Sequence, residues 1–261
     1  MGRKYKFIVL FVLALATFPK EMFSQFYNGH QLRFGKNRVQ YNDLYWEYYR
    51  FPRYDTYFYL DGKNLARYAS KVIDEELKNM EDFFSHSLDS RIIFLIYNKH
   101  SEFKQSNIGL VSGSEETNLG GSAKIINNKV FIYYEGDHRK FVKQIRAAIA
   151  EVLFIDIMFG GNFRQRVSSS ALLTVPDWYY KGLISYLTED WNFEIENKIK
   201  DALENGKLRK FNHLKDEEAV IAGHAIWYFI SKNYGSGVIP NILYLTRINK
   251  NVESGFYMCW D

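Results

Sequence analysis

The sequence predicts an α+β domain, with a small β-sheet in its first half and a mostly helical second half. Short β-prone or continuously apolar runs occur only early, at 56–60, 91–97 and 124–134. The later chain instead carries a succession of segments with helical start and stop signals, at 176–187, 193–205, 216–233 and 237–248. Strands first and helices afterwards are typical of this fold class.

Composition supports one globular domain. The chain has 261 residues, of which 47% are hydrophobic and 25% charged, as in ordinary folded proteins. We find no internal repeat and no Pro/Gly-rich linker that would divide it. The lone cysteine, Cys259, excludes a disulfide framework and any metal site built from several thiolates.

Two long helices frame the predicted sheet. Apolar residues recur at helical spacing from Leu65 to Phe84, with charged residues between them. A second helix is expected over 138–159, because Asp137 is a favourable N-cap and Gly160-Gly161 a favourable end. Between them, 91–97 (RIIFLIY) is typical of a buried strand, and 124–134 of a hairpin that turns at Asn127-Asn128. Pro176 is expected to open the next helix.

Residues 1–24 have the pattern of a secretory signal. A basic stretch precedes a twelve-residue, largely apolar run at 7–18, which as a helix would span about 18 Å and is too short for a hydrocarbon core of about 30 Å. We therefore expect export to the periplasm or cell envelope, with cleavage near Ser24. The alternative is an uncleaved anchor. No later run predicts a transmembrane span.

The charge balance gives no indication of a nucleic-acid partner. Residues 1–24 contribute a net +3 of the total +4, so 25–261 carries only +1. A chain so close to neutrality lacks the basic surface that binds phosphate backbones.

An aromatic block at 41–61 is the most unusual local feature, since ten of its twenty-one residues are Tyr, Phe or Trp. Such rings could form an exposed binding face, for example for a glycan. They could equally pack on a sheet and against the first helix. The candidate binding aromatics are Tyr45, Trp46, Tyr48, Tyr49, Tyr57 and Tyr59.

Several of these segments resemble one known family. GKNRVQYNDLYWEYYR at 35–50, KVFIYYEGDHRKFVKQIRAAIAEVL at 129–153 and VPDWYYKGLISYL at 175–187 are similar, in order and approximate spacing, to peptidase-MA-like domains of exported bacterial proteins. These are gluzincin, zincin-fold domains that often precede a TolB-type β-propeller. The resemblance implies a zincin-like α+β fold over 25–261, with a small mixed sheet followed by a helical half.

The same resemblance implies that the zinc site is lost. In active members H-E-x-x-H on the second helix and a glutamate on the third hold Zn²⁺, because imidazoles at i and i+4 share one helix face. These positions correspond here to Ala147, Ala148 and Glu151, and to Lys181. Independently of that alignment, no two of the six histidines lie within ten residues of each other. We therefore expect no metal, no cofactor and no hydrolysis.

Two outcomes are open for the vacated ligand positions. Glu151 and Lys181 could form an ion pair that fills the space of the metal. Otherwise the two side chains point elsewhere and the alanines close the gap.

The expected function is that of a catalytically inactive cell-envelope binding or scaffold module, whose groove holds an extended peptide or an envelope protein. One alternative is a metallopeptidase with displaced ligands from His138, His224, Glu151 or Asp177. Another is a glycan-binding module that uses the aromatic block.

Other polar features have plain structural explanations. The glycine-containing loop 112–121 lacks a phosphate-binding motif, and Ser168-Ser169-Ser170 lacks the context of a nucleophile. His224 is expected to be a packed imidazole, Asp177 a helix-start carboxylate, and Glu189-Asp190 a solvated helix end. The family usually continues into more helix and a propeller, so a chain ending at Asp261 is either truncated or a lone domain.

Overall fold

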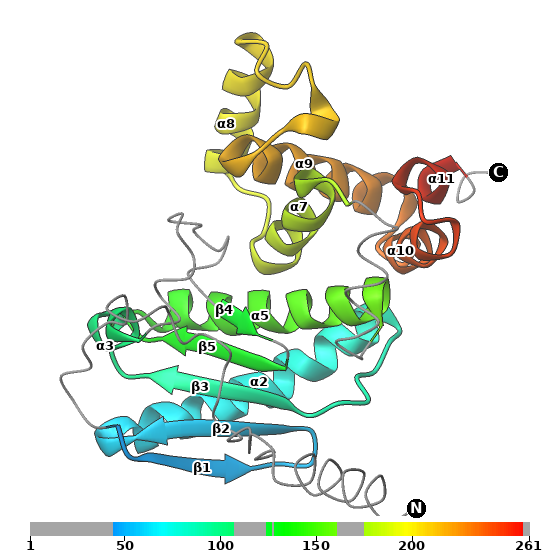
Figure 1. The fold of residues 1–261 in the computed structure, drawn as a ribbon. Coiled ribbons are helices and arrows are strands. Elements are labelled where there is room, and N and C mark those ends of the chain that lie inside the picture. Colours follow the sequence, from blue (N-terminus) through cyan, green and yellow to red (C-terminus); the bar gives the residue numbers. More distant parts are fainter. Residues whose placement is uncertain (1–43, 107–123, 127, 161–174, 258–261) are drawn as a thin grey trace, which may run out of the picture.

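The computed structural model describes residues 44–106, 124–126, 128–160 and 175–257 (Figure 1). Its sheet has five strands in the order β1-β2-β3-β5-β4. The central strands β2, β3 and β5 are parallel, and the edge strands β1 and β4 are each antiparallel to their neighbour. The strands are β1 (Trp46–Arg50), β2 (Tyr54–Tyr59), β3 (Ile92–Tyr97), β4 (Lys124–Ile126) and β5 (Lys129–Tyr133).

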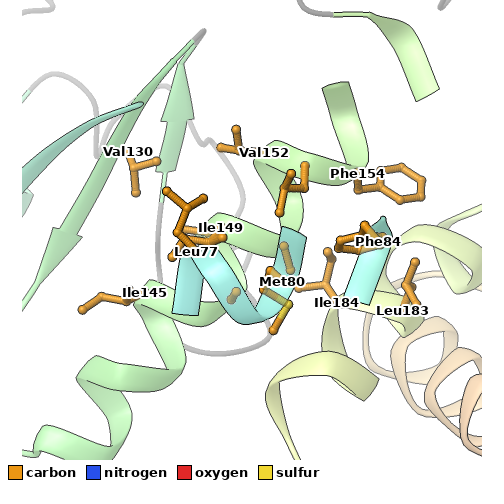
Figure 2. Packing of buried hydrophobic residues seen from close by; sticks show 14 of the residues in the cluster. Leu77, Met80, Phe84, Val130, Ile145, Ile149, Val152, Phe154, Leu183 and Ile184 are labelled. Carbon is orange, nitrogen blue, oxygen red and sulfur yellow. The ribbon is translucent and has the colours of Figure 1, made fainter. Parts of the chain in front are cut away.

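Helices α2 (Lys63–Phe84) and α5 (His138–Phe159) cover one face of this sheet, and a layer of further helices lies on the far side of α5 (Figure 1). One apolar core joins sheet, α2, α5 and the helical layer, and Figure 2 shows part of it. The helical layer consists of α7 (Asp177–Thr188), α8 (Phe193–Glu204), α9 (Asp216–Tyr234), α10 (Val238–Asn249) and α11 (Val252–Tyr257). The short helices are η1 (Leu60–Gly62), α3 (His100–Gln105) and η2 (Phe211–His213).

The prediction of a domain with a mixed sheet and a helix-rich second half is confirmed. The Asp137 carboxylate accepts hydrogen bonds from the backbone N–H groups of Arg139 and Lys140, which fixes the start of α5. Gly160 ends it with a φ of 78°. Pro176 differs slightly from expectation. Its extended backbone, with ψ of 149°, makes it the residue before α7 rather than the first residue within it.

The opposite face of the sheet carries a second, mostly aromatic cluster. Side chains alternate between the two faces along each strand, so Tyr59, Tyr97, Phe131 and Tyr133 point away from α2 and α5. Phe103 from α3 packs among them. Both faces of the central strands are therefore buried, which explains why β3 reads as a continuous apolar run.

Helices α7 and α9 cross unusually closely, because a glycine from each lies at the contact. A Cβ atom on Gly182 would overlap the Cα of Gly223, and a Cβ atom on Gly223 would overlap the backbone oxygen of Trp178. The indole N–H of Trp227 donates a 2.9 Å hydrogen bond to the carbonyl of Tyr179 at the same crossing. This contact holds α7 in place against α9.

None of the helices in the described ranges combines the length and the apolar character that crossing a membrane requires.

We predict that Gly223→Ala lowers the free energy of unfolding by roughly 3 kcal/mol, because its methyl group meets backbone that cannot move aside without separating α7 from α9. Chemical denaturation monitored by circular dichroism measures this change. Gly237→Ala is the matched control, since a Cβ atom there meets nothing within 4 Å. Equal stability of the two variants would contradict the close crossing.

Candidate functional site

The positions to which the resemblance assigns an H-E-x-x-H motif lie at the centre of α5, where the helix packs against the rest of the protein. Ala147 is 1% exposed and Ala148 is fully buried. Their methyl groups carry no lone pairs, so neither residue can bind a metal ion or act as a base. At these two positions α5 offers packing surface only.

Lys181 lies on α7 with a local ion-pair partner. Its Nζ atom is 3.4 Å from Asp177 Oδ2, one helical turn earlier. Lys215 approaches the same carboxylate oxygen at 3.2 Å. Of the two outcomes left open by the sequence, Lys181 follows the second: it pairs with Asp177 within α7 and not with Glu151 across the two helices.

Glu151 instead neighbours Tyr180 on α7. Burial, together with the charge and hydrogen-bonding of Glu151, raises the pKa of the Tyr180 hydroxyl well above its ordinary value. The phenol therefore keeps its proton and can donate it in a hydrogen bond. Phe154, one turn further along α5, packs on the Tyr180 ring with 4.8 Å between ring centres. At this point of the α5–α7 crossing the Glu151 carboxylate therefore lies beside the Tyr180 ring, on which Phe154 packs.

The alternative metal ligands do not come together. His138 stacks on Tyr68 at the start of α5, and His224 lies on α9, bonded to Ser185. Asp177 is engaged by two lysines. Over the described ranges, no group of three His, Cys, Asp or Glu residues is placed to hold a metal ion.

His224 is a buried imidazole with one satisfied nitrogen. Its side chain is 1% exposed, and Nδ1 lies 2.9 Å from the Ser185 hydroxyl. Nε2 has no hydrogen-bond partner in the described part of the chain, and the rings of Tyr186 and Trp191 stand edge-on to the imidazole. Burial lowers the pKa of His224 to about 4, although Glu189 and Asp190 oppose the shift. The imidazole is therefore neutral at physiological pH.

Some of the six candidate binding aromatics are buried, and others are exposed. Tyr59 is fully buried, with Trp46 edge-on to it. Tyr48 and Tyr57, paired across β1 and β2, stack with ring centres 5.1 Å apart, and Tyr48 is 49% exposed. Tyr45 is exposed before β1 begins.

Tyr49, the remaining candidate, points to the opposite face of the sheet, towards α2. It packs on Phe58 there, with ring centres 4.8 Å apart. The block therefore combines packing with exposure.

Sequence reasoning missed two features beside this block. Asp55 is 2% exposed and receives hydrogen bonds from both Arg50 and Arg91, an arrangement visible only once strand register is known. A pocket between β1 and α2 was also missed, although Arg67, Lys71 and Asp74 follow one another at helical spacing.

Glu189, expected in a solvated helix end, bridges α7 to α5 through a 3.2 Å ion pair with Lys143, while Asp190 is exposed. The loop 112–121, Ser168-Ser169-Ser170, Cys259 and the segment 1–24 lie outside the described residues.

Neither the models of known protein families nor the curated proteins gave a match to this chain.

We predict that Lys181→Met changes the free energy of unfolding by less than about 0.5 kcal/mol, because a partly exposed i,i+4 pair contributes little. Thermal or chemical denaturation measures it. Arg146→Met is the contrasting variant, since it strands the nearly buried Glu76, which Arg146 binds through two hydrogen bonds of 2.6 and 2.9 Å. That loss should be about 3 kcal/mol. A Lys181→Met loss of the same size would assign Lys181 a structural role.

We predict that stability falls as the pH drops from about 6.5 to about 4, because the unfolded chain protonates His224 before the folded one does. The stabilising contribution is complete above that window and decreases by up to about 3 kcal/mol across it. Denaturation curves at several pH values measure it. In His224→Gln this part of the pH dependence should vanish, whereas exposed His213→Gln should keep it. Parallel wild-type and His224→Gln profiles would refute the prediction.

Proposed function

We propose that this chain is a zincin-like domain of the peptidase-MA-like type that works as a binding or scaffold module of the cell envelope and does not hydrolyse peptides. The arrangement of its elements supports the proposal. A mixed sheet with an antiparallel edge strand, β4, is covered by α2 and α5, and α7 packs across α5. Those are the elements that the resemblance assigns to the two zinc-binding helices and the sheet beside them.

The observation that carries the proposal is the chemistry of the α5–α7 crossing. Where an active zincin places two imidazoles and a carboxylate, this chain has buried Ala147 at the first position and Lys181, held by Asp177, at the last. A fixed ammonium group repels a dication, and a methyl group cannot replace an imidazole. Glu151 alone keeps an oxygen ligand, and one carboxylate is too few for a zinc site.

The proposed binding mode is strand addition at β4. This strand lies at the edge of the sheet and packs beside α5. An edge strand has unpaired backbone N–H and C=O groups along its free side, and an extended peptide can pair with them. Side chains at the neighbouring end of α5 would then select the sequence of the peptide. The partner class is accordingly an extended segment of an envelope protein.

The proposed location rests on residues 1–24, whose basic start and short apolar run have the pattern of an export signal.

We predict that purified wild-type protein retains no stoichiometric zinc and shows no peptidase activity that a chelator abolishes. Elemental analysis and a quenched-fluorescence peptide assay measure these. The positive control is the triple variant Ala147→His, Glu151→His, Lys181→Glu, which restores three ligands at the proposed spacing. This variant should bind close to one zinc ion per chain. One zinc ion per chain in the wild-type protein would overturn the proposal.

Peptide binding is measured separately on the wild-type protein, so that the result does not depend on whether the triple variant folds. A peptide library screened against isotopically labelled wild-type protein should shift backbone amide signals of β4 and of the facing end of α5. Binding confined to other surfaces, or no binding at millimolar peptide, would refute strand addition while leaving the absence of zinc unaffected.

A further inference from the structure

A pocket of about 440 Å³ lies between the edge of the sheet at β1 and helix α2. Tyr49, Phe51 and Tyr54 provide its aromatic wall, and Arg67, Ser70, Lys71 and Asp74 provide its helical side. The volume is within the range of small-molecule sites, which are mostly apolar with a few placed polar groups. It lies on the side of the sheet opposite to the stacked Tyr48 and Tyr57 rings.

The wall is rigid. The Phe51 and Tyr54 rings stack with centres 4.7 Å apart, and Tyr49 packs on Phe58. The Tyr54 hydroxyl donates a 2.8 Å hydrogen bond to the backbone oxygen of Ser70, which ties the wall to α2. The aromatic surface is therefore preformed, and a ligand would lose little free energy by ordering it.

One polar atom in the pocket is left unsatisfied. The Tyr49 hydroxyl is buried and has no hydrogen-bond partner within the described ranges. A buried hydroxyl without a partner is unfavourable by about 1–3 kcal/mol. The oxygen is not open to solvent, so a ligand in the pocket meets the Tyr49 ring and not its hydroxyl group.

The charges on α2 set the chemistry of the occupant. Arg67, Lys71 and Asp74 lie on one face of the helix and are exposed, and none of the ion pairs among the described residues includes them. Two cations against one carboxylate favour a ligand with one negative charge. The exposed carboxylate of Asp74 can accept a hydrogen bond from a ligand hydroxyl group, which benzoate does not offer.

We propose that this pocket binds an anionic saccharide of the uronic-acid class. The apolar face of the sugar ring packs on the aromatic wall, its carboxylate pairs with Arg67 and Lys71, and its hydroxyl groups donate to Asp74. The site is separate from the α5–α7 crossing and from β4, so it does not depend on the zincin-like assignment.

The test titrates the full-length protein by isothermal calorimetry with a galacturonic acid oligosaccharide, the matching galactose oligosaccharide and benzoate. The uronate should bind at least fivefold more tightly than either of the other two. Failure of the uronate to bind at millimolar concentration, equal affinity for the neutral sugar, or tighter binding of benzoate would each overturn the proposal.

Two variants assign the binding to this pocket. Arg67→Gln combined with Lys71→Gln should weaken uronate binding at least tenfold and remove the preference over the neutral sugar. Tyr49→Ala, which removes part of the aromatic wall, should weaken it about fivefold. Lys232→Gln on α9, exposed and distant, is the charge control. Unchanged affinity in both pocket variants would refute the site.

Discussion

The burial of the middle of α5 between the two halves of the molecule is the constraint on which the rest of the structure depends. This helix contacts α2 and the sheet on one side and α7 and α10 on the other, so it belongs to both halves of the molecule (Figure 1). Ala147, Ala148 and Ala150 lie in its middle and are all nearly or fully buried. Small side chains let neighbouring helices approach closely, and they exclude water and ions from the place where they pack. These alanines therefore help to form the contact that joins the two halves.

At the neighbouring crossing of α7 and α9, glycines rather than alanines allow the two helices to approach closely. Gly182 and Gly223 allow backbone-to-backbone contact, and Trp178 and Tyr179 fill the space on either side. This arrangement gives a structural reason for the P-x-W-x-x-x-G-L pattern at 176–183, which does not involve catalysis. It also fixes the rotation of α7, so that Lys181 lies one turn from Asp177 and forms its ion pair there. The ammonium group of Lys181 is thus accommodated on the helix surface.

Elements with strong local signals could be predicted from the sequence, and contacts between elements could not. The bounds of α5 followed from the Asp137 cap and the glycine after Phe159. Strand β1 was not identified as a strand, because its aromatic and charged residues give no regular apolar pattern, and α3 is too short to show a period. The partner of Lys181 was missed because the choice between Asp177 and Glu151 depends on how α7 is rotated. Likewise the Tyr49 hydroxyl became notable only when the register of β1 with β2 placed its ring over α2.

The strand order also separates the two proposed binding regions. The pocket lies at β1 and the proposed peptide-binding edge at β4, which are the opposite edges of the sheet. Four strand spacings of about 4.8 Å put these edges about 19 Å apart. The charge of a saccharide in the pocket and the charges of a peptide at β4 would interact weakly at that distance, since it exceeds the Debye length at physiological salt. A saccharide held by Arg67 and Lys71 would therefore leave β4 free for a peptide. If both proposals hold, a domain with a packed centre and two separate edges can hold two ligands at once, which is what the proposed scaffold between a polysaccharide and an envelope protein requires.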